Sequence, residues 1–479
     1  MNIVKKFFLV TLLFAGVTEF STAQKKPTEV IILHTNDMHA KIDNMGKLAY
    51  LRDSLQKTHK YVYLLSAGDN FTGNPIVDMY PQIGYPMIDL MNKTHFTLST
   101  VGNHEFDMGQ ENLEKRRKEA QFPFISANID VSGTHMTKIK PYAFLKAGCV
   151  EIPVLGLIQL GKRGIPDSHP SKLIGLKFTN GIKKAEDYKW LKKKYGMLIA
   201  LTHLGVEDDS ILAKNMPQID LIIGGHSHTI LRTPSVVNGV MIVQAGSSLA
   251  FVGKTTLILK DKKIINKKYE LIPLDWIKNT NSNVQKLVDK YNNNPEMMKV
   301  VAVAEAPFRN KEELGCLMTD AITSEMGTDF AFQNWGGVRV SNIPEGNIPL
   351  KQIYLLDPFG NKVIIYKMTY DEIKALVLNS FNRSREIDLY VSGMSYTILT
   401  DSKGNGIDVE MKTIAGKNLD KNKIYKVGMN SYISSSYEFS YTEKVAETNK
   451  TSAQTLLDYL TKVKKVNYAK VKRTSVEKK

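Results

Sequence analysis

Cysteine and long apolar runs are scarce in this chain of 479 residues, and each shortage excludes a class of protein. The two cysteines, Cys149 and Cys316, cannot build a disulfide framework, so we predict two unpaired, partly buried thiols. They also argue against a structural zinc site made of several thiolates. Beyond the N-terminus, no apolar run reaches the ~18 residues of a membrane span. We therefore expect no membrane span in the mature protein.

The first 23 residues have the three parts of a secretory signal peptide. Lys5 and Lys6 precede the apolar stretch FFLVTLLFAGV, and small residues then lead to Ala23. We predict cleavage after Ala23 and export to the periplasm or the extracellular space. An amphipathic helix or a membrane anchor is the alternative. No cysteine stands at the cleavage point, which argues against a bacterial lipid anchor.

The formal net charge of the chain is +16. Nucleic-acid binding is one interpretation of this charge, but the lysines are spread over loops and the tail instead of forming a stripe with aromatic residues. A solvated basic surface that also attracts anionic substrates fits this distribution better. We expect no specific nucleic-acid partner.

The pattern along the chain predicts two domains. In residues 28–275, apolar strands alternate with amphipathic helices, which predicts an α/β domain with helices on both sides of a sheet and a closing lysine-rich hairpin. Residues 276–300 are polar and predict a linker helix. Residues 301–479 mix helices with short strands and glycine turns. They predict an α+β domain that ends in an amphipathic helix and a frayed tail.

Five apolar runs of the first domain are typical of buried parallel strands, and each ends in side chains that can bind a metal. In open α/β sheets, ligands bind beyond the carboxyl ends of the strands. The candidate metal ligands at these ends are Asp37, His39, Asp69, Asn103, His203, His226 and His228. The remaining histidines are given no role: His34, His59, His95, His135 and His169.

The spacing and chemistry of the candidate ligands predict a dinuclear metal centre. Asp37 with His39, and His226 with His228, are alternate residues, whose side chains point to the same side of an extended chain. Nitrogen and oxygen donors without thiolate suit Zn, Mn, Fe or Co. Two carboxylates cannot neutralise two divalent ions, so the centre should attract a phosphate.

The stretches HTNDMHA, SAGDNFTGNP, TVGNHEFDMG, ALTHLG and GGHSHT resemble the calcineurin-like metallophosphoesterases, and among them the 5′-nucleotidase/UDP-sugar hydrolase family. NWGGVR and DPFGN resemble the nucleotide-binding segments of that family's C-terminal domain. The resemblance implies a four-layer-type metallophosphoesterase domain, a C-terminal α+β nucleotide-binding domain and two divalent ions.

The resemblance also implies how the metal ligands divide and which residues act beside them. One ion would take Asp37, His39, Asp69 and His228. The other would take Asp69, Asn103, His203 and His226. His104 would face the phosphate as a catalytic residue, and Asp107 would orient it, whereas Glu105 looks structural.

In the second domain, the resemblance implies four substrate-binding residues. Arg339 would hold a phosphate or carboxylate, Phe359 would stack on a base, Asn361 would bond the edge of the base, and Asn334 belongs to the same motif as Arg339. The family's Gly-Gly-Asp-Gly-Phe segment has no counterpart in NSYISSSYEFSYTE. Candidates for a second stacking aromatic are Tyr432, Tyr437 and Phe439. Candidates for a further family arginine position are Arg309, Asn310 and Lys311.

These features predict an exported phosphohydrolase with two metals, most simply a 5′-nucleotidase acting on nucleoside monophosphates. A nucleotide-sugar or 2′,3′-cyclic-nucleotide phosphodiesterase on the same scaffold is the alternative enzyme. A non-catalytic envelope protein that binds nucleotides is the alternative from another class.

Overall fold

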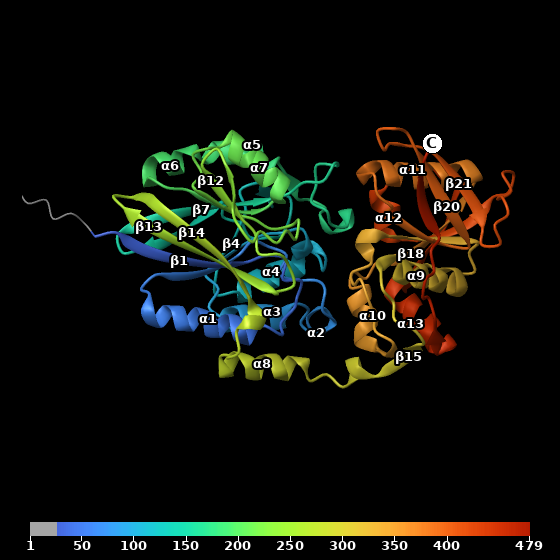
Figure 1. Cartoon of the computed structure of the whole chain (residues 1–479), viewed down its shortest axis with the longest axis horizontal. Helices are drawn as coiled ribbons and strands as arrows, with labels where there is room; N and C mark the ends of the chain where they lie inside the picture. The colour runs from blue at the N-terminus through green and yellow to red at the C-terminus, as the bar shows by residue number, and fades with distance from the viewer. Residues whose placement is uncertain (1–25) are drawn as a thin grey trace, which may run out of the picture.

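The computed structural model describes residues 26–479, so the predicted signal peptide lies outside the described residues. Two lobes lie side by side, and the yellow helix α8 runs beneath the first of them (Figure 1). Within residues 26–479, none of the helices is long and apolar enough to cross a membrane. Both thiols are free, as predicted, and Cys316 is buried, but Cys149 is exposed, so the expectation of partial burial was wrong for Cys149.

The first lobe contains two six-stranded sheets. One has the order β14 (Lys263–Pro273), β13 (Phe251–Lys260), β1 (Thr28–Thr35), β2 (Val62–Ser66), β3 (Leu98–Thr100), β4 (Phe124–Ile125). The other has the order β11 (Ser235–Val237), β12 (Val240–Val243), β10 (Leu221–Ile223), β9 (Ile199–His203), β7 (Val150–Ile158), β6 (Tyr142–Ala147). A two-stranded sheet joins β5 (Ile129–Asp130) and β8 (Lys177–Phe178).

The two large sheets pack face to face, because alternate side chains of each strand enter a shared core. Val30 and Ile32 of β1 meet Val154 of β7 and Leu201 of β9 in this core. The opposite face of each sheet is covered by helices. On the first sheet these are α1 (Met45–Thr58), α3 (Tyr85–Lys93) and α4 (Gln110–Glu119). On the second sheet they are α5 (Gly181–Ala185), α6 (Lys189–Tyr195) and α7 (Val206–Asn215).

The first domain therefore has four layers, as the family resemblance implied. The expectation of helices on both sides of a single sheet was wrong. Alternating strands and helices along the chain do not reveal which sheet each strand joins, because that depends on pairing between distant residues. The predicted closing hairpin is β13–β14, which pairs antiparallel from Phe251 opposite Pro273 to Lys260 opposite Lys263.

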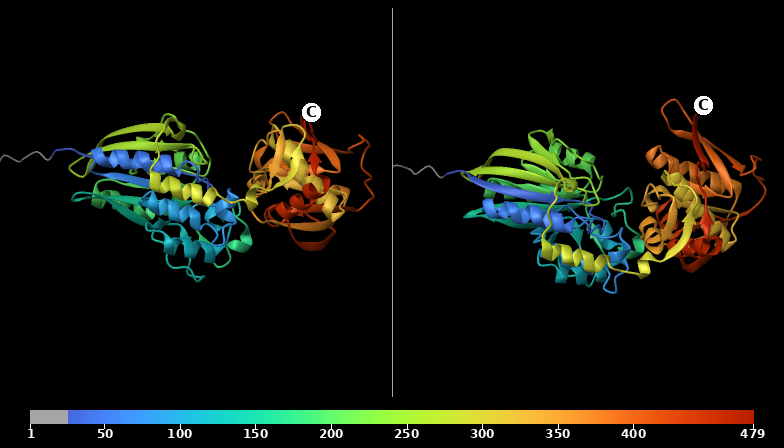
Figure 2. Two further views of the ribbon diagram at one scale, coloured as in Figure 1. Left: turned by 90° about the horizontal axis from the view of Figure 1, so that it is seen from below. Right: turned by 60° about the horizontal axis from the view of Figure 1, so that its bottom comes forward.

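Helix α8 (Ser282–Asn292) follows the first domain and packs against it. Its N-cap Asn281 accepts bonds from the Asn283 and Val284 amides. Val284 and Val288 enter the core beneath α1 and α3, and Tyr291 Oη donates to Asp89 Oδ2 at 2.6 Å. The chain then crosses to the second lobe, as both turned views show (Figure 2).

The second lobe is α+β. Its five-stranded sheet has the order β19 (Leu389–Ser392), β16 (Phe330–Asn334), β22 (Tyr425–Asn430), β18 (Lys362–Met368), β23 (Glu443–Thr451). Two smaller sheets have the orders β17 (Gly346–Pro349), β15 (Val300–Ala304), β24 (Lys465–Val466) and β21 (Gly406–Thr413), β20 (Met394–Thr400), β25 (Thr474–Lys478). The helices are α9 (Lys311–Met326), α10 (Leu350–Leu356), α11 (Tyr370–Ser384), α12 (Ser431–Ser436) and α13 (Ser452–Val463).

The predicted terminal helix is α13, but the frayed tail after it was a wrong expectation. Residues Thr474–Lys478 form strand β25, which pairs parallel to β20. Arg473 anchors this strand, since its Nη1 donates to Asp320 Oδ1 at 2.6 Å. A lysine-rich composition is typical of a solvated tail, but it also suits the edge strand of a sheet.

Candidate functional site

The candidate metal ligands lie at the carboxyl edge of the two large sheets. His203 is the last residue of β9, and the others follow β1, β2, β3 and β10 by two to five residues. Five of them have a backbone φ from 46° to 79°, in the left-handed region that non-glycine residues rarely adopt. These five are Asp37, His39, Asp69, His226 and His228. Strain of this kind persists where the surrounding structure holds a functional geometry.

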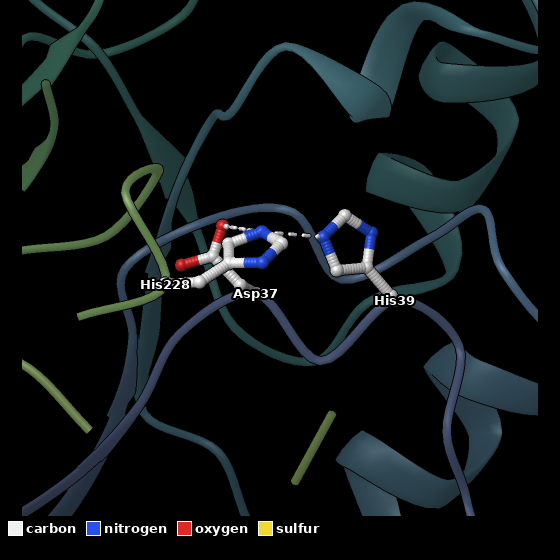
Figure 3. A group of neighbouring side chains, drawn as sticks. All are labelled: Asp37, His39 and His228. Carbon is white, nitrogen blue, oxygen red and sulfur yellow. Dashed lines mark hydrogen bonds and ion pairs between the residues drawn. The ribbon is translucent and has the colours of Figure 1, made fainter. Parts of the chain in front are cut away.

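One cluster joins the loops after β1 and β10. Asp37 and His39 come from the first loop and His228 from the second (Figure 3). Nε2 of His39 lies 3.0 Å from Nε2 of His228, which lies 3.4 Å from Asp37 Oδ1. His39 Nδ1 lies 3.0 Å from the carbonyl of Thr72. That contact assigns the proton to Nδ1 and leaves the lone pair of Nε2 facing the cluster.

A second cluster contains Asp69, Asn103, His203 and His226. His203 Nε2 lies 3.0 Å from Asp69 Oδ2 and 3.2 Å from Asn103 Oδ1. Asn103 Oδ1 is also 3.1 Å from His226 Nδ1. His203 Nδ1 is held by the carbonyl of Ala67 at 2.7 Å, so its Nε2 is directed into the cluster.

Both clusters fit a cation, because lone pairs converge in each of them. Burial alone would lower the pKa of His203, but the carboxylate of Asp69 raises that pKa to about 10. This corner of the site therefore stabilises positive charge. Nitrogen and oxygen donors make up both groups, which suits divalent ions of borderline softness.

The loops after β2 and β3 are held together by Glu105, which is buried. Its Oε1 accepts from the backbone amide of Asn70 at 2.7 Å. Its Oε2 accepts from the backbone amides of Asp69 at 3.0 Å and Gly102 at 2.6 Å. A β-carbon at Gly102 would collide with Asp69 Oδ1, so the close approach requires glycine. Glu105 thus fixes the backbone beneath Asp69, in keeping with a structural role.

His104 begins a short 3-10 turn (His104–Phe106) directly after Asn103 and points into the cleft. Its Nδ1 bonds Asp107 Oδ2 at 2.6 Å, and its Nε2 lies 4.0 Å from Asp69 Oδ2. Burial lowers the pKa of His104, but Asp107 and Asp69 outweigh that effect, and the pKa lies above its usual value. The imidazole is therefore oriented by Asp107 and biased towards its charged form.

A cleft of about 730 Å³ separates the two domains and is lined by both. Arg339 crosses it, and its Nη2 lies 3.2 Å from Nε2 of His39. The Phe359 ring lies over His104, with centroids 5.8 Å apart, and 5.5 Å from the Arg339 guanidinium. The second domain thus places a cation and an aromatic face beside the clusters of the first.

Asn334 and Asn361 also line the cleft. Asn334 Oδ1 accepts from Asn430 Nδ2 at 2.9 Å, so this side chain also braces β16 against β22. Asn361 Oδ1 accepts from Ser431 Oγ at 3.3 Å at the start of α12. All four substrate-binding residues predicted in the second domain therefore lie on one wall.

The three candidates for a second stacking aromatic lie in different places, and one of them lines the cleft. Tyr432 lines the cleft. Tyr437 turns away and donates to Asp388 Oδ2 at 2.5 Å, and Phe439 packs on Tyr366 with centroids 5.4 Å apart. Tyr432 is thus the candidate on the cleft wall.

Within the described chain, none of the candidates for the further arginine position is among the residues that line the cleft. Asn310 is the N-cap of α9, and Lys311 Nζ lies 3.5 Å above the Trp335 ring. The amide of Arg309 donates to Glu313 Oε2 at 2.6 Å. These residues secure the start of α9.

Asp167, Ser168 and His169 line the cleft, although the sequence pattern predicted no role for them. They lie on the loop that follows β7, which pairs parallel with β9 and so ends at the same edge of the sheet. The polar run after the apolar stretch EIPVLGLI is the signal that could have found them. His169 belongs to the histidines given no role, yet it lies on the cleft wall.

Comparison with known proteins agrees with this geometry. A family model of the calcineurin-like phosphoesterases matches residues 30–229, and a model of the 5′-nucleotidase C-terminal domain matches residues 297–440. The chain belongs to the 5′-nucleotidase family of calcineurin-like phosphoesterases. Membership makes it a metal-dependent phosphoesterase hydrolase and overturns the alternative of a non-catalytic binding protein.

Relatives within this family align over most of the chain. Protein UshA of Yersinia enterocolitica is 27% identical over 496 residues, covering 87% of each protein. The crystal structure of a 5′-nucleotidase precursor from Thermus thermophilus has a TM-score of 0.82 at 26% identity, covering 94% of this chain and 99% of that one. The trifunctional nucleotide phosphoesterase protein YfkN of Bacillus subtilis is 27% identical over 469 residues, which are 85% of this chain but 32% of YfkN. The chain thus spans about a third of that relative.

Proposed function

We propose that the chain is an exported 5′-nucleotidase with two metal ions, which hydrolyses nucleoside monophosphates to a nucleoside and phosphate. The observation that carries this proposal is the division of the cleft. Side chains from both candidate metal clusters line one wall, and Arg339, Phe359 and Asn361 line the other. A phosphate on the first wall and a base on the second would place a nucleotide across the cleft.

The two clusters would each hold one divalent ion, of Zn, Mn, Fe or Co by donor type. Bound there, the ions would supply Lewis-acid polarisation of the phosphate ester. Arg339 would bind the phosphate by charge-assisted hydrogen bonds. His104, with Nδ1 fixed by Asp107, would present Nε2 to the phosphoryl group, where an imidazolium can stabilise charge or give a proton to the leaving oxygen.

Nucleotide recognition would come from the second domain. Phe359 would stack on one face of the base, and Asn361 would bond its edge. Tyr432 is the best-placed candidate for the other face, because it lies on the cleft wall. The relative from Thermus thermophilus, whose fold and length this chain shares, is described as a 5′-nucleotidase precursor, which supports a nucleotide substrate.

Export rests on the sequence of residues 1–23. A mature chain that begins at or near Gln24 in periplasmic or secreted material would support it, and intact mass gives the answer. Material outside the cytoplasm that retains Met1 would overturn the cleavage.

A phosphodiesterase acting on a nucleotide sugar or a 2′,3′-cyclic nucleotide is the second candidate, and one observation favours the nucleotide sugar. A second cavity of about 570 Å³ adjoins the cleft and shares Asp167, Trp335 and Tyr432 with it. It offers room for a group beyond the nucleotide.

Purified mature protein would decide between these activities. We expect phosphate release from AMP to exceed turnover of UDP-glucose or 2′,3′-cyclic AMP, and a chelator to abolish all hydrolysis. Metal analysis should give two equivalents per chain. Preferred cleavage of UDP-glucose would instead establish the phosphodiesterase, and phosphate release that survives complete metal removal would overturn the two-metal proposal.

A further inference from the structure

Asp167 and Ser168 reach two different parts of the site from one loop. Asn103 Nδ2 donates to the carbonyl oxygen of Asp167 at 3.0 Å. Ser168 Oγ donates to Asp107 Oδ1 at 3.2 Å. The loop therefore touches both a predicted metal ligand and the residue that orients His104.

The carbonyl of Asp167 decides which end of the Asn103 amide faces the second cluster. A carbonyl oxygen can only accept, so the Nδ2 end of the amide must lie against it. The Oδ1 end then lies 3.2 Å from His203 Nε2 and 3.1 Å from His226 Nδ1. A backbone atom holds this orientation, so it survives changes of the Asp167 side chain.

Ser168 holds the carboxylate of Asp107 in one orientation, as the carbonyl of Asp167 holds the Asn103 amide. One oxygen of this carboxylate bonds His104 Nδ1 at 2.6 Å, and the other accepts from Ser168 at 3.2 Å. Ser168 is 3% exposed, so water competes little for its hydroxyl. A carboxylate held at both oxygens cannot rotate, and the imidazole plane of His104 is fixed with it.

We propose that Ser168 is a positioning residue for phosphate ester hydrolysis. Its hydroxyl completes a chain of hydrogen bonds that runs from Ser168 through Asp107 to His104. The proposal rests on the proposed function, because it assigns His104 to the phosphoryl group. Without the hydroxyl, Asp107 would turn more freely, and Nε2 of His104 would spend less time aimed at the substrate. Binding of substrate and metal would be nearly unaffected.

Ser168→Ala in the full mature chain tests this role. A hydrogen bond to a charged acceptor contributes enough for kcat to fall about 10-fold or more on both AMP and p-nitrophenyl phosphate. We expect KM, metal content and Tm to stay near their wild-type values. Ser168→Thr keeps the hydroxyl and should restore most of kcat.

Ser126→Ala is a matched control. Ser126 is 2% exposed and donates to Asn128 Oδ1 at 3.2 Å, so its burial and bond length resemble those of Ser168. It lies outside the residues that line the cleft. We expect its removal to leave kcat unchanged.

A double variant tests whether Ser168 acts through Asp107. In an Asp107→Ala background the acceptor is absent, so Ser168→Ala should add little further loss of kcat. A full additional loss there, an unchanged kcat in the single variant, or a drop in metal content equal to the drop in kcat would overturn the proposal. Wild-type turnover of AMP tests the nucleotidase itself, whereas the ratio of variant to wild type on p-nitrophenyl phosphate tests Ser168 independently.

Discussion

The two walls of the cleft differ in how deeply their side chains are buried and in whether these side chains lie at strand ends or in turns. In the first domain, the cluster residues Asp37, Asp69 and His203 are at most 1% exposed and lie at or just after the ends of parallel strands, whereas His228 is exposed. On the second-domain wall, Trp335 is 52% exposed and Phe359 is half-buried, and both lie in turns. Most side chains assigned to the chemistry are thus buried, whereas the aromatic side chains of the second-domain wall lie on turns.

The difference follows from what each wall has to do. Converging lone pairs must be held before the cation arrives, so each of His39, His104 and His203 has its second ring nitrogen tied to another group. A base needs only an aromatic face and an edge contact. Turn residues can supply both, and they can change without disturbing the core.

The largest effect should come from the first wall. Asp69 belongs to the second cluster, and one of its carboxylate oxygens also lies within 4.8 Å of ring nitrogens of His39 and His104. Asp69→Ala should therefore abolish hydrolysis of every substrate and lower the metal content of both clusters. Elemental analysis of the purified variant measures this, with exposed Asp130→Ala as the control. Two retained metal equivalents would contradict the bridging role.

His104→Ala should separate catalysis from metal binding on that wall. We expect kcat to fall by about 10²–10⁴-fold, the range of general acid–base groups, because no other imidazole is directed at the phosphoryl group by Asp107. Metal content should stay near normal by the same elemental analysis. If the variant lost metal as Asp69→Ala is expected to, the division between ligand and catalyst would be wrong.

Arg339→Ala should show whether the second-domain wall also binds the phosphate. The guanidinium lies 3.2 Å from His39 Nε2, so it should serve the phosphate common to all substrates. We expect KM to rise about 10-fold or more for both AMP and p-nitrophenyl phosphate, as for a lost bond to a charged group. Arg339→Lys should recover only part of this, because lysine keeps the charge without the planar fork. A rise confined to AMP would place Arg339 at the nucleoside instead.

Phe359→Ala should give the smallest and most selective effect. Loss of a stacking face should weaken AMP binding by about 1–3 kcal/mol, mainly through KM. Phe439→Ala is the matched control, because Phe439 packs on Tyr366 outside the cleft. An equal rise of KM for AMP in both variants would mean that the effect comes from packing of the domain.

Parts of this arrangement could be predicted from sequence because their signals are local. The candidate ligands end or follow five apolar strands, so the gathering of Asp37, Asp69 and His203 at one edge follows from parallel pairing. The layering into two sheets could not be predicted by pattern alone. It depends on β13 returning to pair with β1, more than 200 residues away in sequence.

The loop that carries Asp167 and Ser168 was missed for the same reason. Its place at the site depends on β7 lying beside β9, and its contacts use a backbone carbonyl and a serine hydroxyl, which no spacing marks as functional. The choice of Tyr432 over Tyr437 also needed the structure. Both are tyrosines of one short segment, and only the path of α12 decides which one faces the cleft.

The most direct test compares losses of kcat/KM on two substrates for two variants. His104→Ala and Phe359→Ala should each be measured with AMP and with p-nitrophenyl phosphate, which shares the phosphate but lacks a base. We predict that His104→Ala lowers kcat/KM by a similar factor on both substrates, whereas Phe359→Ala lowers it for AMP and leaves p-nitrophenyl phosphate nearly unchanged. Equal losses on both substrates for Phe359→Ala would contradict the assignment of nucleotide recognition to the second wall.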